Sequence, residues 1–181
     1  MAGSPDHADP GSSVELRATT VLYAQTVLFS LTLGMIMMLT PLYVLELGYS
    51  VAWLGVIISA QGVFQLGLRL FGGVLSDRVG ERWVIAANFL ALLSAALLLA
   101  LFEALWLLIL AQLLTGASRS IYWTASQSYA SRINEAKSVS IIGRFFGIGA
   151  AGGIVGTFAG GLLAGTVGYT VGFLMTTGMG A

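Results

Sequence analysis

One arginine lies within an otherwise uncharged, apolar stretch of the chain, and polar or aromatic residues recur around it at helical spacing. Arg119 follows Gln112 by seven residues. Seven residues are close to two turns of an α-helix, so both side chains fall on one face, about 10 Å apart along the axis. Thr115, Tyr122 and Trp123 extend this polar and aromatic face. Such a face is suited to binding a small solute, and we expect these five residues to contact substrate.

A second polar face is expected on the first apolar stretch of the chain. Polar, small or soft residues recur there at spacings of three and four: Thr19, Tyr23, Thr26, Ser30, Gly34, Met37 and Pro41. A face of this kind on an apolar helix is typical of a cavity wall. We expect Tyr23 and Ser30 to contact substrate from this side. In the next apolar stretch Arg69 continues a row from Gln61 and Gln65, and we interpret Arg69 as structural.

The apolar stretches contain no aspartate, glutamate or histidine, so they offer no pair of groups for acid–base catalysis. The one histidine, His7, lies in the polar N-terminal segment without neighbouring ligands, and no metal site is predicted. Gly147, Gly149 and Gly152 have a dinucleotide-binding spacing, but they fall within an apolar helical stretch and do not follow a strand. We therefore expect no cofactor and no enzymatic activity.

The composition identifies the solvent that these elements meet. Of 181 residues, 57% are hydrophobic and only 9% are charged, with 24 glycines and no cysteine. A soluble domain carries about 25% charged residues, so this chain could not cover a globule with polar surface. Eight basic and eight acidic side chains leave no net charge to attract nucleic acid. The expected environment is a lipid bilayer.

The apolar stretches are long enough to cross that bilayer as helices, for which about 20 residues are needed. Uninterrupted hydrophobicity, without alternation, predicts helices and not barrel strands. We predict an all-α polytopic bundle over residues 18–181, following a disordered cytoplasmic tail over residues 1–17. The predicted spans cover about residues 19–45, 51–75, 83–102, 104–129, 140–164 and 168–181, and the sixth is truncated.

The basic residues predict the orientation of the bundle. One side of it carries Arg17, Arg78, Arg82, Arg132 and Lys137, whereas the other carries Glu46 and Glu103 and no lysine or arginine. Positively charged loops stay in the cytoplasm. We therefore expect an integral protein of the plasma (inner) membrane with a cytoplasmic N-terminus.

The connection between the second and third predicted spans carries the most specific motif. Residues 72–85 read GGVLSDRVGERWVI, which resembles the loop signature of the major facilitator superfamily. The resemblance implies a gating lock between two halves of a transporter, formed by Gly73, Asp77, Arg78, Gly80 and Arg82. Asp77 ends a helix, where the macrodipole disfavours a negative charge, so it needs a cationic partner. The alternative is a solvated loop whose charges only set the orientation.

Glycines of the fifth predicted span form a second pattern. Gly152, Gly156 and Gly160 recur every four residues and line one helix face, which allows a close helix neighbour. Together with Gly161 they resemble the antiporter-associated pattern of the same family, with Thr157 in place of its proline. We interpret these glycines as a helix-packing face and infer no antiport from them.

The order of the spans and the depth of Arg119 indicate how a solute would be handled. Spans one to three run opposite to spans four to six, which is the inverted-repeat plan of many transporters. An arginine facing lipid costs about 3 kcal/mol or more, so Arg119 should face a cavity or pair with an anion. A structural pair with a carboxylate outside this sequence is the alternative.

The resemblance implies the N-terminal six-helix half of a secondary active transporter that works by alternating access, as a symporter or antiporter. The expected partners are a small-molecule substrate, a proton or other coupling ion, the lipid bilayer and the missing C-terminal half, with no nucleic acid. Efflux of drugs or organic anions is the expected activity. The alternative is a complete small transporter or channel that acts as a homodimer.

Overall fold

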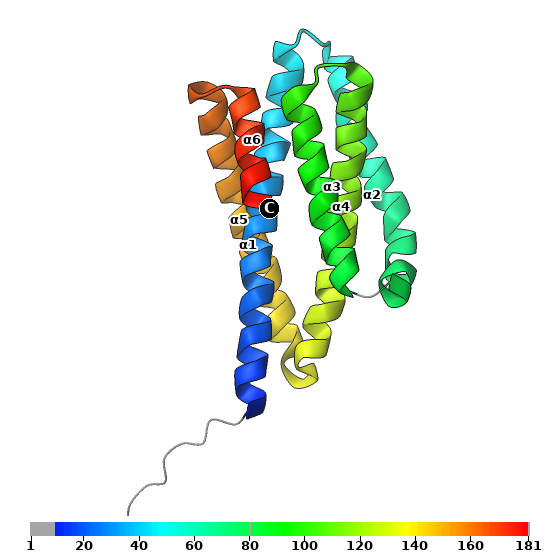
Figure 1. The fold of residues 1–181 in the computed structure, drawn as a ribbon, viewed down its shortest axis with the longest axis vertical. Coiled ribbons are helices and arrows are strands. Elements are labelled where there is room, and N and C mark those ends of the chain that lie inside the picture. Colours follow the sequence, from blue (N-terminus) through cyan, green and yellow to red (C-terminus); the bar gives the residue numbers. More distant parts are fainter. Residues whose placement is uncertain (1–9, 80, 181) are drawn as a thin grey trace, which may run out of the picture.

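The chain folds into a bundle of six helices joined by short turns (Figure 1). The computed structural model describes residues 10–79 and 81–180. The helices are α1 (Pro10–Glu46), α2 (Val51–Val79), α3 (Glu81–Leu101), α4 (Leu105–Ile133), α5 (Ser138–Thr166) and α6 (Tyr169–Gly180), with a 3₁₀ turn at Glu135–Lys137. No strand occurs in this part of the chain, which confirms the all-α prediction.

The lengths of the helices follow from the apolar stretches, and glycines end two of them. Four helical segments are long and apolar enough to cross a membrane: Ser13–Glu46, Val51–Arg69, Leu105–Ile133 and Glu135–Thr166. In α3, the apolar segment Ala86–Leu101 is shorter. Gly48 and Gly168, with φ of 82° and 85°, turn the chain after α1 and α5. Glycine adopts this left-handed conformation without the steric penalty of a side chain.

The N-terminal end of α1 departs from the sequence prediction. The predicted disordered tail extends to residue 17, but α1 already begins at Pro10. Proline is favoured in the first turn of a helix, since its missing N–H is not needed there. Glu15 also accepts hydrogen bonds from Lys137 Nζ and Asn134 Nδ2, both at 2.9 Å. These contacts anchor the first turns of α1 to the α4–α5 turn.

The pattern of packed helix pairs is the same for the first three helices and for the last three. α1 packs against α5 and α6, whereas α4 packs against α2 and α3, and α3 contacts α6. Replacing helices 1, 2 and 3 by 4, 5 and 6 leaves this set of pairs unchanged. α1 and α4 also run in opposite directions, as Figure 1 shows. The pairing therefore has the symmetry of the predicted inverted repeat.

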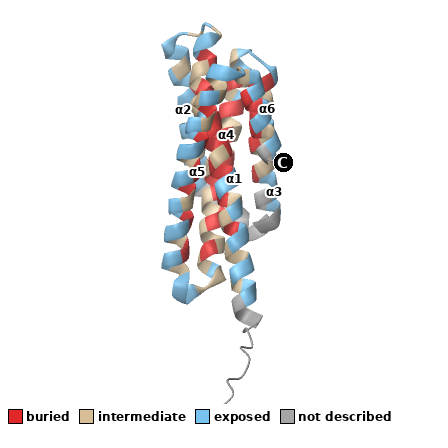
Figure 2. Ribbon diagram, turned by 90° about the vertical axis from the view of Figure 1, so that its left-hand side faces the viewer, coloured by how far each residue is buried: buried red, intermediate tan, exposed pale blue. Residues whose placement is uncertain are grey.

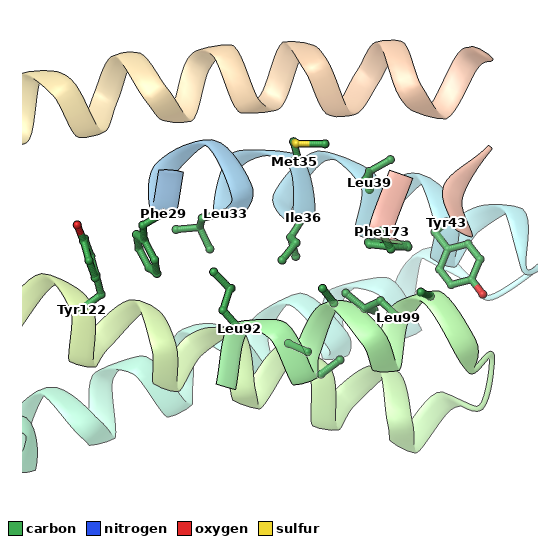
Figure 3. Close-up of a cluster of buried hydrophobic side chains, with 14 of the residues drawn as sticks. Phe29, Leu33, Met35, Ile36, Leu39, Tyr43, Leu92, Leu99, Tyr122 and Phe173 are labelled. Carbon is green, nitrogen blue, oxygen red and sulfur yellow. The ribbon is translucent and has the colours of Figure 1, made fainter. Parts of the chain in front are cut away.

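The apolar core lies between α1, α3, α4 and α6. Figure 3 shows side chains of α1 that face Leu92 and Leu99 of α3, Tyr122 of α4 and Phe173 of α6. Each of these four partner side chains is at most 1% exposed. The α1 and α4 helices run through the middle of the bundle, whereas α2 and α5 are largely exposed (Figure 2). Within an apolar stretch of 18 residues in each helix, 11% of the residues are buried in α2, against 61% in α1.

Backbone-to-backbone contacts bring the helices of two pairs unusually close. A β-carbon at Gly156 of α5 would collide with the Leu31 carbonyl of α1. A β-carbon at Gly34 of α1 would collide with the Gly153 carbonyl of α5, and one at Gly116 of α4 would collide with the Gln61 carbonyl of α2. Small residues permit this kind of approach between membrane helices. The two pairs, α1–α5 and α2–α4, are equivalent under the repeat.

Candidate substrate cavity

A cavity of about 440 Å³ lies between α1, α2, α4 and α5, and we call it the central cavity. Its walls combine cationic, amide, hydroxyl, aromatic and aliphatic side chains with glycine backbone. The lining residues are Ser30, Leu33, Gly34, Met37, Gln65, Arg69, Arg119, Trp123, Gln127, Phe146, Gly149, Ala150, Gly153 and Thr157. This volume is within the range of small-molecule sites, which are about 300–1,000 Å³.

The α4 wall consists of Arg119, Trp123 and Gln127, which follow one another at four-residue spacing. This spacing places them on one helix face. Arg119 Nη1 lies 3.8 Å from Met37 Sδ, and its buried Nε has no hydrogen-bond partner in the part of the chain that the structure describes. The structure thus places Arg119 and Trp123, two of the predicted contacts, at the cavity.

The α1 and α5 walls add a polar group and a second aromatic ring. Ser30, predicted as a contact, lines the cavity, and its Oγ is buried without a partner. Phe146 of α5 stacks on Trp123, with ring centroids 5.4 Å apart and planes 5° apart. Phe146 was not predicted from the sequence, because an apolar ring in an apolar helix carries no signal of which face it occupies.

The α2 wall of the central cavity includes Arg69. We interpreted this residue as structural, but it lines the central cavity together with Gln65 and Arg119. Gln65 and Arg69 are four residues apart, so one face of α2 presents both. The i, i+4 row of polar residues was the sequence signal that could have assigned them to the site.

Three of the predicted α4 contacts lie in the core and not at the cavity. Gln112 is 2% exposed, and its Nε2 donates to Thr40 Oγ1 at 3.3 Å. Thr115 is fully buried and donates to the Ala111 carbonyl at 2.8 Å. Tyr122 stacks on Phe29 with ring centroids 3.8 Å apart, and its hydroxyl lies 2.9 Å from Thr26 Oγ1. Gln112 and Tyr122 thus bond to side chains of α1, and Thr115 bonds to the backbone of its own helix.

Tyr23 lies at a different cavity, at the end of the bundle that carries the N-terminus. Its hydroxyl donates to the Ile141 carbonyl at 3.4 Å. Lys137, Arg144 and Glu15 line the same cavity of about 420 Å³. Ser30 follows Tyr23 by seven positions, which correspond to about 10 Å along α1 and separate Tyr23 from the central cavity.

The predicted gating residues fall at the α2–α3 connection. Gly73, Asp77 and Arg78 belong to α2, and Arg82 belongs to α3. Gly80 and the side chains of Asp77, Arg78 and Arg82 lie outside the described residues. The gating lock stays a prediction from the sequence.

The glycines of α5 lie against α1. The position of a β-carbon would be 3.1 Å from Ser30 Cβ at Gly152, 3.0 Å from the Met35 carbonyl at Gly160 and 3.5 Å from Met38 Cε at Gly161. With Gly156 against Leu31, these glycines follow α1 over about three helical turns. This is the contact that a helix-packing face requires.

The charges of the described side chains are unevenly distributed. Four acidic side chains are described, namely those of Glu15, Glu46, Glu103 and Glu135, and none of them lines the central cavity. Within the described part of the chain, no cluster of three or more histidine, aspartate or glutamate side chains could hold a metal ion. The central cavity therefore presents two guanidinium groups to a solute.

Comparison with known proteins identifies the family. A sequence model described as Major Facilitator Superfamily matches residues 22–181. The chain is similar to the multidrug resistance protein MdtG of Salmonella paratyphi C, with 27% identity over 88% of this chain and 41% of the relative. The MdtG protein of Citrobacter koseri is 28% identical over the same shares. The chain thus spans about two fifths of the length of these curated relatives. With its helical fold and most of its length matched, the chain belongs to the Major Facilitator Superfamily.

Proposed function

We propose that the chain is the N-terminal six-helix part of a secondary active transporter that moves a small organic solute by alternating access. The central cavity carries this proposal, since helices from both repeats form its walls. The first helix of each repeat contributes a polar lining residue: α1 contributes Ser30 and α4 contributes Arg119. Equivalent helices line the pathway in transporters built from inverted repeats.

The proposed substrates are drugs or organic anions, and the proposed direction is efflux. The matched relatives are named multidrug resistance proteins, which supports a drug-like solute. A proton or another ion would drive the transport, and a C-terminal half would supply the facing wall of the pathway. No enzymatic step is part of the proposal.

The proposed location is the plasma membrane, with the N-terminus in the cytoplasm. Lys137 and Arg132 lie near the α4–α5 turn, and the contact of Lys137 with Glu15 puts this turn at the same end of the bundle as the first turns of α1, which include Arg17. At the opposite end Glu46 ends α1 and Glu103 precedes α4. This distribution follows the positive-inside rule. In the proposed mechanism, Asp77 and its arginine neighbours stabilise the state closed to the cytoplasm.

Export from cells tests the transport function directly. Cells that lack their own major drug exporters would express the full-length protein that contains this chain. They would be loaded with ethidium, Nile red or carboxyfluorescein, which carry positive, no and negative charge. We expect faster export of at least one dye than from vector-only cells, and loss of this export with a protonophore. Equal export of all three dyes with and without the protein would contradict the proposal.

Cysteine labelling tests alternating access. The chain contains no cysteine, so Gly153→Cys would introduce a single thiol into this part of the protein. A β-carbon at Gly153 meets no atom within 4 Å, and the residue lines the central cavity. A membrane-impermeant thiol reagent should label this cysteine from either side of the membrane during transport. Labelling from one side alone under all conditions would count against alternating access.

A further inference from the structure

The central cavity contains two arginines that come from different helices. Arg69 belongs to α2 and Arg119 to α4, and both line the same space of about 440 Å³. Both guanidinium groups therefore belong to the wall of one solute-sized space. No acidic side chain of the described residues lines this space. Among the side chains that the structure describes, none compensates these two positive charges.

The hydrogen-bond donors of the two side chains are largely unused. Arg119 Nε is buried and has no hydrogen-bond partner among the described residues, and the contact of Nη1 with Met37 Sδ is long, at 3.8 Å. Arg69 forms no hydrogen bond or ion pair with any described residue. Each guanidinium presents five N–H donors in a planar fork. Carboxylate, sulfonate and phosphonate groups have the oxygen geometry that this fork binds in a bidentate manner.

An aromatic wall lies one helical turn from this cationic group. Trp123 follows Arg119 by four residues and stacks on Phe146 across the α4–α5 contact. Four residues correspond to about 6 Å of helix rise. A solute that spans this distance would carry its charged group at one end and an aromatic or apolar body at the other.

We propose that the central cavity selects amphipathic organic anions, whose oxyanion group is shared by Arg69 and Arg119 and whose apolar body lies against Trp123 and Phe146. This inference rests on the proposed transport function and names the substrate class of the same cavity. Organic cations are disfavoured, since they would enter next to two guanidinium groups. Neutral apolar solutes retain the aromatic contact and lose the charge-assisted hydrogen bonds.

A matched set of probes tests this selectivity. Naphthalene-1-sulfonate, 1-naphthalenemethanol and 1-naphthylmethylammonium share one ring system and differ in charge. Their binding to the purified full-length protein would be measured by equilibrium dialysis in a non-ionic detergent. We expect the sulfonate to bind at least about tenfold more tightly than the alcohol, since charge-assisted hydrogen bonds contribute most of that difference. The ammonium compound should bind most weakly.

Variants assign the selectivity to the two arginines. Arg69→Gln and Arg119→Gln should each weaken sulfonate binding about tenfold and leave alcohol binding nearly unchanged. Arg69→Lys and Arg119→Lys should restore part of the affinity, because they keep the charge and lose the fork. Trp123→Ala should weaken the binding of sulfonate and alcohol alike. Arg144→Gln, outside the central cavity, is the matched control and should change neither affinity.

The readouts separate this inference from the transport function. Unchanged size-exclusion profiles and unfolding temperatures would show that the variants are folded. Equal affinity for the three probes, or unchanged sulfonate binding in both arginine-to-glutamine variants, would overturn the inference. If the protein exports ethidium and the sulfonate fails to bind, transport stands and anion selectivity fails. If no dye is exported and no probe binds, both proposals fail.

Discussion

The indole ring of Trp123 lies over Gly149, so close that a β-carbon at this glycine would be 2.6 Å from Trp123 Cη2. Trp123 belongs to α4 and Gly149 to α5, and both line the central cavity. The absence of a side chain at Gly149 therefore permits the position of the Trp123 ring at the cavity wall. The position of this ring is a property of two helices and not of the tryptophan alone.

Gly149→Ala should displace the Trp123 ring and change the shape of the central cavity. We expect a several-fold change in the KM for transport of the solute, with protein abundance largely retained, since a ring edge can shift where a backbone cannot. Gly147→Ala is the control, because a β-carbon there meets nothing within 4 Å and this α5 residue is not among those that line the central cavity. Similar KM values for the wild type and Gly149→Ala would show that the ring does not contact the solute.

Gly156→Ala should destabilise the bundle much more than Gly153→Ala. The added methyl group would collide with the Leu31 carbonyl of α1, which cannot move without the helix. Overpacking of this kind costs about 1–3 kcal/mol. The measurement is the unfolding temperature of the full-length protein in detergent. An unfolding temperature of Gly156→Ala within the error of Gly153→Ala would contradict the close α1–α5 contact.

Tyr122→Phe should lower stability slightly and leave transport unchanged. The substitution keeps the stack on Phe29 and removes the 2.9 Å hydrogen bond to Thr26 Oγ1. A hydrogen bond between membrane helices contributes about 0.6 kcal/mol on average. A double-mutant cycle with Thr26→Val would isolate the coupling of the two groups. A large rise in KM for Tyr122→Phe would instead indicate that this hydroxyl contacts the solute.

Glu15→Gln should destabilise the protein at neutral pH and have less effect in acid. Hydrogen bonds from Lys137 and Asn134 lower the pKa of Glu15 below its ordinary value of 4.5. Glu15 precedes the span that the sequence predicts over about residues 19–45. A lowered pKa in the folded state stabilises the protein above the ordinary pKa, and this contribution is lost as the pH falls through the folded-state value. The difference in unfolding temperature between wild type and Glu15→Gln should therefore shrink below pH 4.5.

The matched control for this pH dependence is Glu135→Gln. Glu135 lies in the same α4–α5 turn, and its carboxylate forms no hydrogen bond or ion pair with the described residues. The Glu135→Gln substitution should leave the unfolding temperature nearly unchanged at pH 7 and at pH 3. A constant difference between wild type and Glu15→Gln from pH 7 to pH 3 would contradict the role assigned to the Glu15 carboxylate.

Asp77→Asn should shift the transporter toward the state open to the cytoplasm and reduce transport. The reason is the loss of the carboxylate that we expect to hold the cytoplasmic side closed. A cysteine at Gln127 of the central cavity should then react faster with an impermeant reagent added on the cytoplasmic side. Glu46→Gln, at the opposite end of the bundle, serves as the control. Equal reaction rates in the Asp77→Asn and control proteins would argue against the lock.

Much of the fold could be predicted from the sequence because the bilayer imposes simple rules. Uninterrupted apolar stretches of sufficient length must form helices in lipid, and the α5–α6 turn follows from Gly168. The tail was harder to predict, because the polar residues 10–17 carry no apolar pattern. Their helix depends on contacts of Glu15 with a turn that is over 100 residues away in the sequence.

The site was predictable in part. Arg119, Trp123 and Ser30 were found because polar or aromatic groups at helical spacing stand out in apolar helices. The place of Arg69 at the central cavity could not be predicted, since the rotation of α2 against α4 involves the contact of Gly116 with Gln61. Tyr122 and Gln112 carry the same polar signal as Arg119, yet their groups are satisfied within the bundle. Spacing finds a polar face, and only packing shows which part of it is open.

The glycine contacts also determine which parts of the molecule can move. Each close crossing joins one repeat to the other, through Leu31 and Gly156 or through Gln61 and Gly116. Because carbonyl oxygens and α-carbons already touch there, the two repeats cannot slide past each other without breaking the α1–α5 and α2–α4 crossings. Closely packed elements of this kind are bistable at most and do not deform continuously. We therefore expect the α1–α5 pair and the α2–α4 pair each to move as one rigid unit in any rocking motion.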